Sequence, residues 1–168
     1  GRVPAQQGLA LHLGQVVGNT DFTAKVVDDV TTADDPYLHP FRAAVEARTA
    51  SLMVSTVTYT RIDAKHPAVF SPAVIGLIRK QLGFDGVVIS DDLGAAKSMA
   101  AVPSRRRAVD FVKAGGDVAI TVAPGLAAAF VQGIVSAADD NTSVEAQVRR
   151  AAIRVVTMKV DQGLLPCR

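Results

Sequence analysis

The chain is poor in cysteine and in aromatic residues. Its 168 residues include one cysteine, Cys167, no tryptophan and 5% aromatic residues in all. A single cysteine cannot form an internal disulfide, which excludes a disulfide-stapled scaffold and leaves the redox compartment open. No signal-peptide pattern is visible at Gly1, so the sequence does not decide between a cytoplasmic and an exported protein.

The sequence also lacks a dominant charge and an unbroken apolar run of membrane length. The net charge is +2, with basic residues spread along the chain, which argues against a dedicated nucleic-acid surface. We expect the basic clusters at 105–107 and 149–150 to lie on solvated helix faces. Residues 118–138 carry no charge, but Pro124 and Gly125 interrupt them. A strand, a turn and a helix are therefore expected there instead of a membrane span.

Short apolar runs that alternate with helical patterns are what the sequence does contain. Hydrophobic residues make up 49% and charged residues 20%, as in soluble globular domains. The runs predict parallel strands near 51–56, 86–90 and 117–122, with helices over 40–47, 71–81, 104–113, 126–137 and from 143 to Gly163. Ser71, Ser104 and Ser143 are the expected helix N-caps. The alternation predicts one α/β domain over residues 1–168, with right-handed crossovers and a divergent or loop-rich segment at 1–35.

Two adjacent aspartates, Asp91 and Asp92, follow the most apolar of these strands. Residues 82–92 give the end of a helix, a turn at Gly83, a buried strand and then both carboxylates. Parallel α/β folds carry their chemistry at the C-terminal ends of strands, where a carboxylate can be nucleophile, base or metal ligand. Asp92 is expected to support Asp91 or to contact substrate. The acidic pairs at 28–29 and 34–35 lack histidine or cysteine partners at ligand spacing, so we expect no metal or cofactor.

Residues 83–93, Gly-Phe-Asp-Gly-Val-Val-Ile-Ser-Asp-Asp-Leu, closely resemble the nucleophile segment of family 3 glycoside hydrolases, in the single-domain β-N-acetylglucosaminidase branch. Weaker similarities follow in the right order at 51–55, 67–71 and 114–122, and the resemblance covers roughly residues 14–165. It implies a (β/α)₈ TIM barrel, a retaining mechanism, an N-acetylglucosaminide-like carbohydrate substrate and Asp91 as the nucleophile.

The resemblance is weakest in the first thirty residues. The family's Lys-His-Phe-Pro-Gly strand end has no counterpart, and the loop triplet Asp-Ser-His, whose histidine is the general acid/base, aligns with Asn19, Thr20 and Asp21. Asp21 is then the candidate acid/base, provided that burial raises its pKa well above about 4. The remaining histidines in the later part of the chain, His39 and His66, are expected at the surface or at helix caps.

The chain is short for a complete barrel, which typically needs about 250 residues. By resemblance it holds the last three or four strands, the C-terminal half of the barrel. An open half-barrel exposes strand edges, so we expect a homodimer or a complex with a separate N-terminal half. Three functions stay open: a family 3 glycosidase active once the missing strands are supplied, a non-catalytic binding or assembly module, and an unrelated α/β enzyme using Asp91 as a base.

Overall fold

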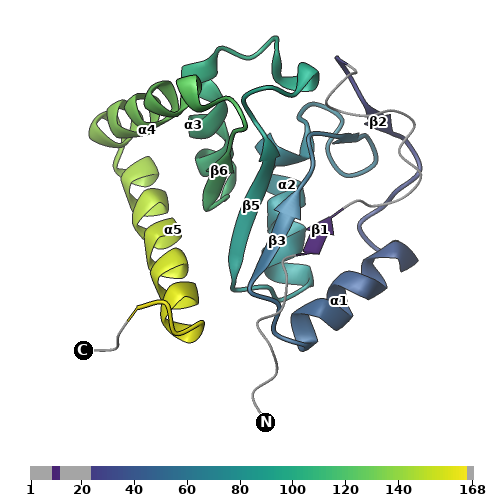
Figure 1. Cartoon of the computed structure of the whole chain (residues 1–168). Helices are drawn as coiled ribbons and strands as arrows, with labels where there is room; N and C mark the ends of the chain where they lie inside the picture. The colour runs from purple at the N-terminus through teal and green to yellow at the C-terminus, as the bar shows by residue number, and fades with distance from the viewer. Residues whose placement is uncertain (1–8, 12–23, 166–168) are drawn as a thin grey trace.

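A four-stranded parallel sheet forms the centre of the molecule (Figure 1). The computed structural model describes residues 9–11 and 24–165. The sheet has the order β1-β3-β5-β6, with β1 at Leu9–Leu11, β3 at Ser51–Val54, β5 at Val87–Asp92 and β6 at Val118–Ile120. Every neighbouring pair is parallel. The three predicted strands and their parallel pairing are confirmed.

Helices follow the strands in the expected alternation. They are α1 at His39–Glu46, α2 at Pro72–Gly76, α3 at Ser104–Ala114, α4 at Ala127–Asp140 and α5 at Thr142–Asp161. A π-helical turn, η3 at Leu77–Gln81, continues α2. Short 3₁₀ turns are η1 at Pro36–Leu38, η2 at Ala68–Phe70, η4 at Lys97–Met99 and η5 at Pro124–Leu126. The result is part of a TIM-barrel-like α/β fold.

A second, two-stranded parallel sheet lies beside the first. It pairs β2, Val27–Asp28, with β4, Thr58–Tyr59. The buried carboxylate of Asp28 accepts hydrogen bonds from the backbone N–H groups of Val30 and Thr31 at 3.0 and 2.8 Å. Asp28 is therefore buried because its carboxylate closes the turn after β2.

One of the three helix N-caps predicted from the sequence is confirmed. Ser71 caps α2, since its Oγ accepts a hydrogen bond from the N–H of Val74 at 3.2 Å. Two other predicted caps are wrong. Ser104 is the first helical residue of α3, which has no side-chain cap. At α5 the cap is Asn141, whose Oδ1 accepts from the N–H of Ser143 at 2.9 Å.

A glycine marks the end of two helices. Gly83 and Gly115 have φ values of +69° and +108°, in the left-handed region where a side chain is strained. Gly115 is the C-cap of α3, and Gly83 follows the end of η3 and turns the chain toward β5. The predicted turn at Gly83 is confirmed.

The central strands are covered on both faces. Leu52 and Val54 of β3 and Val87 and Val88 of β5 are all fully buried. Burial of such side chains is the main source of stability in a fold of this kind. The unbroken apolar runs of the sequence correspond to this two-sided burial, as is typical of parallel sheets.

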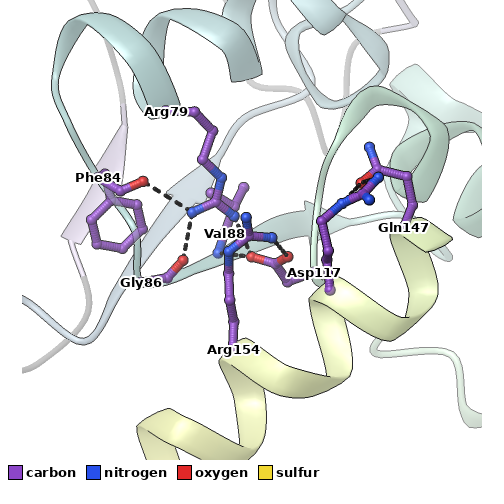
Figure 2. Close-up of polar contacts among 8 residues, drawn as sticks. Arg79, Phe84, Gly86, Val88, Asp117, Gln147 and Arg154 are labelled. Atoms are coloured by element: carbon purple, nitrogen blue, oxygen red, sulfur yellow. Dashed lines mark hydrogen bonds and ion pairs between the residues drawn. The ribbon is translucent and has the colours of Figure 1, made fainter.

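An ion-pair network lies at the N-terminal ends of β5 and β6. Asp117 precedes β6, and its side chain, which is 1% exposed, pairs with the guanidinium groups of Arg79 and Arg154. The same carboxylate accepts from the N–H of Val88 at 2.8 Å. Figure 2 shows the two arginines reaching Asp117 from α5 and from the π-helical turn. This network attaches α5 to the sheet.

Candidate active site

Asp91 and Asp92 are the last two residues of β5, at the opposite end of that strand from Val88 and the Asp117 network. Both are partly exposed, whereas Ser90 just before them is fully buried. The Oδ1 atom of Asp91 accepts a hydrogen bond from the backbone N–H of Asp92 at 2.8 Å. The strand thus ends with a carboxylate whose orientation is set in part by the next peptide group.

The carboxylate of Asp92 is bonded to backbone. Its Oδ1 accepts from the N–H of Gly94 at 2.9 Å and from the N–H of Val122 at 3.2 Å, and its Oδ2 accepts from the N–H of Ala95 at 2.9 Å. Asp92 therefore holds the turn after β5 and joins it to the residues after β6. This geometry fits a supporting role beside Asp91.

Close packing at Gly94 reinforces this connection. A Cβ atom at Gly94 would lie 1.8 Å from Oγ1 of Thr121, so a larger residue there would push the segments after β5 and β6 apart. Ser90 adds a further link, because its Oγ accepts from the N–H of Ile120 at 2.9 Å. The ends of β5 and β6 are fixed relative to each other.

Arg107 of α3 also holds the turn after β5, a contact that the sequence analysis did not predict. Its Nη1 donates to the carbonyl oxygens of Leu93 and Gly94 at 2.9 and 2.8 Å, and its Nε donates to that of Val102 at 2.7 Å. The expectation that residues 105–107 lie on a solvated face is wrong for Arg107, which is 8% exposed. Its spacing of four from the buried Phe111 was the available signal.

The end of β3 also contacts the turn after β5. The hydroxyl groups of Thr56 and Ser98 are 2.8 Å apart, and Thr56 is buried. Three neighbouring strand ends are therefore joined by polar contacts around Asp91 and Asp92. This is the arrangement in which α/β barrels place their active sites.

A third carboxylate, Asp63, lies in the loop between β4 and η2. Ser71 Oγ donates to Asp63 Oδ2 at 2.7 Å, and His66 Nδ1 is 2.9 Å from the same oxygen. Burial raises the pKa of Asp63, but the hydrogen bonds from Ser71, His66 and the backbone of Lys65 outweigh it and lower the pKa to about 2. Since His66 is half exposed and its partner supports the cap of α2, this cluster is structural.

Asp21, the candidate acid/base, lies outside the described residues. His39 is exposed at the first position of α1. Over residues 24–165, no group of three histidine, cysteine or acidic side chains is arranged to hold a metal ion. The described site is one of carboxylates and backbone groups.

Comparison with known proteins identifies the family. Residues 14–158 match the family described as "Glycosyl hydrolase family 3 N terminal domain". This match covers most of the chain and includes the whole segment from β3 to α4. The chain belongs to glycoside hydrolase family 3. The family assignment made from residues 83–93 is confirmed.

Relatives within family 3 carry related names. The chain is 43% identical over 100 residues to a beta-hexosaminidase of Thiobacillus denitrificans, covering 57% of this chain and 26% of that protein. It is 31% identical over 125 residues to a beta-hexosaminidase of Xanthomonas campestris, covering 74% and 37%. Among solved structures, a beta-N-acetylhexosaminidase from Beutenbergia cavernae superposes with a TM-score of 0.86 at 42% identity, covering 90% of this chain and 46% of that one.

The chain thus spans less than half the length of these relatives. Over the described residues the family 3 fold is present in part, with a four-stranded parallel main sheet and its helices. Within the described residues, no helix has both the length and the apolar character needed to cross a membrane.

Proposed function

We propose that this chain supplies the nucleophile of a retaining β-N-acetylhexosaminidase and that Asp91 is that nucleophile. The observation that carries the proposal is the place of Asp91 in the motif at 83–93 and at the C-terminal end of β5, beside a turn fixed by Asp92 and Arg107. The names of the relatives point to an N-acetylated amino sugar joined by a β-glycosidic bond.

The reaction takes place in two displacements. In the first, a carboxylate oxygen of Asp91 bonds to the anomeric carbon, the glycosidic bond breaks, and a general acid protonates the departing oxygen. In the second, water attacks the same carbon, the ester to Asp91 breaks, and the group that gave the proton takes one from water. Asp92 positions Asp91 through the backbone N–H that its own side-chain contacts hold in place.

The general acid is the second residue of the proposal. Asp21 takes this role by its alignment with the loop triplet of the family. A carboxyl group donates a proton near neutral pH only where its surroundings raise its pKa. We therefore expect substrates with activated leaving groups, which need little protonation, to react faster than natural sugars.

A complete active site needs more strands than the four of the described main sheet. A retaining site needs residues around the whole mouth of a barrel, and the described part contributes one arc of it. A homodimer or an N-terminal half of the barrel would supply the remaining arc.

The test compares Asp91→Asn with the parent chain on p-nitrophenyl N-acetyl-β-glucosaminide, in the assembly that shows activity. An amide is a very poor nucleophile, so turnover should fall by about a thousandfold or more. Asp85→Asn, at the other end of the same strand, is the matched control and should retain activity. A fluorinated N-acetylglucosaminyl donor should label the peptide that contains Asp91. Undiminished turnover of Asp91→Asn would remove the proposal.

The second candidate is a non-catalytic binding or assembly module. The observation that favours it is the absence of the family's Lys-His pair and loop histidine from the first thirty residues. Under this alternative the complete assembly binds N-acetylglucosaminides in a calorimeter but neither releases p-nitrophenol nor forms the labelled peptide.

A further inference from the structure

Arg107 of α3 is a buried cation that contacts backbone groups and not a carboxylate. It donates to three backbone carbonyl oxygens at 2.7, 2.9 and 2.8 Å, and the ion pairs among the described residues do not include it. Arg79 also donates to two backbone carbonyl oxygens but is paired with Asp117 as well. Because a buried charge is costly unless an opposite charge compensates it, we expect a negative group close to Arg107.

That negative group is the carboxylate of Asp92, on the other side of two peptide groups. In the peptide group between Leu93 and Gly94, the carbonyl oxygen accepts from Arg107 Nη1 at 2.9 Å. The N–H of the same group donates to Asp92 Oδ1 at 2.9 Å. The next peptide group, between Gly94 and Ala95, repeats the pattern, at 2.8 Å from Arg107 Nη1 and 2.9 Å from Asp92 Oδ2. Two peptide bridges therefore join the guanidinium group to the carboxylate.

The orientation of both bridges is favourable to the two charges. A peptide group has its negative end at the carbonyl oxygen and its positive end at the N–H, and its trans geometry points these ends in opposite directions. Arg107 contacts the negative ends and Asp92 the positive ends. Hydrogen bonds in such a chain polarise and strengthen one another where water is excluded. Loss of the Arg107 charge should therefore loosen Asp92, although the two side chains are joined only through backbone groups.

We infer that Arg107 is a positioning residue of the glycosidase site, which fixes Asp92, and through it Asp91, by way of these two peptide groups. The last link is the backbone N–H of Asp92, which donates to Asp91 Oδ1 at 2.8 Å. A nucleophile held at the correct angle to the reacting carbon attacks faster than one that rotates freely. The inference rests on the proposed function for the reaction and on the described contacts for the positioning.

Amide hydrogen exchange on the chain itself tests the positioning without substrate. Arg107→Gln removes the charge and the planar set of donors. Relative to the N–H groups of β3 in the same variant, which report a general loss of stability, the N–H groups of Gly94 and Ala95 should exchange about tenfold faster or more. The control is Arg79→Gln, which removes a buried arginine at the other end of β5 and should leave this ratio unchanged. If either variant fails to fold, Arg107→Lys and Arg79→Lys replace the pair, with a smaller change expected in the same direction.

Turnover measures the consequence, in the assembly that releases p-nitrophenol. Arg107→Gln should lower kcat about tenfold or more and change KM less than about twofold, because it displaces the nucleophile and leaves the substrate contacts intact. Arg107→Gln combined with Asp92→Asn should be little slower than Asp92→Asn alone, since Arg107 acts through Asp92, whereas a merely structural role would make the two losses independent.

Three results would overturn the inference: an unchanged exchange ratio in the Arg107 variant, an unchanged kcat, or independent losses in the double variant. Absence of turnover in the parent chain would count against the proposed function alone. The exchange ratio would then decide by itself whether Arg107 positions the two carboxylates.

Discussion

Asp91 and Asp117 lie at opposite ends of two adjacent strands and differ in almost every contact. Asp117 is 1% exposed and is neutralised by two arginines. Asp91 is partly exposed, and one hydrogen bond to its carboxylate comes from the neighbouring peptide N–H of Asp92. A buried carboxylate paired with cations stabilises a fold but cannot reach a substrate, whereas a carboxylate at an open strand end can. Position along the strand thus separates the two roles, as it does in α/β barrels generally.

The first prediction compares the same substitution, aspartate to asparagine, at Asp117 and at Asp91. Asp117→Asn should cost about 3–5 kcal/mol of unfolding free energy, because it leaves the partly buried Arg79 and Arg154 without their counter-charge. Burial already lowers the pKa of Arg79, against the attraction of Asp117. Asp91→Asn should cost clearly less, because the Asp91 carboxylate is partly exposed and the variant leaves no buried arginine without a counter-charge. Chemical denaturation of the two variants measures both values. Equal losses would remove the distinction between a structural and a functional end.

The second prediction concerns Asp63, a loop carboxylate whose hydrogen bonds indicate that it stabilises the fold. Asp63 has a pKa of about 2 in the fold against 3.8 for the free side chain, so its ionised form is stabilised by roughly 2 kcal/mol. A lowered pKa gives stability that is complete above about pH 4 and is lost as the pH falls through 2.

The measurement is the unfolding free energy of the parent chain and of Asp63→Asn between pH 2 and pH 6. The parent should lose stability over the acid part of this range, and the curve for Asp63→Asn should be flatter by that amount. Asp110→Asn, a carboxylate paired at the surface with Arg106, is the control and should follow the parent. Parallel curves for the parent and Asp63→Asn would show that Asp63 carries no such linkage.

The contrast between the two ends also shows what the sequence can reveal. The strands and the place of Asp91 at the end of β5 were predictable, because apolar runs and the motif at 83–93 are local patterns. The role of Asp117 was not, since its partner Arg79 is 38 positions away and nothing local indicates that they meet. Arg107 was misjudged for the same reason: its burial depends on carbonyl groups of a turn 13 or 14 positions away. The acid/base assignment to Asp21 stays a prediction.

The third prediction concerns Asp92, which lies beside Asp91 at the end of β5 but whose carboxylate, like that of Asp117, is hydrogen-bonded within the fold. Asp92→Asn keeps one acceptor oxygen but replaces the other by an NH₂ group, so either the N–H of Ala95 or the pair at Gly94 and Val122 loses its acceptor. We expect a loss of roughly 1–2 kcal/mol in stability, with a fall in turnover smaller than that of Asp91→Asn. Denaturation and p-nitrophenol release measure the two effects. Turnover as low as that of Asp91→Asn would give Asp92 a direct part in the chemistry.

The last prediction, with the smallest expected effect, concerns how α5 is held at the N-terminal ends of β5 and β6, where Asp117 lies. Arg154 of α5 reaches Asp117 at 3.0 Å, and Asn141 caps the start of the same helix. Asn141→Ala should cost about 1 kcal/mol, the usual value of an N-cap, while Ser143→Ala should stay within about 0.5 kcal/mol because Ser143 contributes only its backbone N–H. If the ion pair alone fixes α5, Asn141→Ala and Arg154→Ala should add independently, since the two residues are more than three turns apart. A loss of unfolding free energy in the double variant well above the sum of the two single losses would mean that the cap and the ion pair hold the helix cooperatively. The region stabilised through Asp117 would then include the whole of α5.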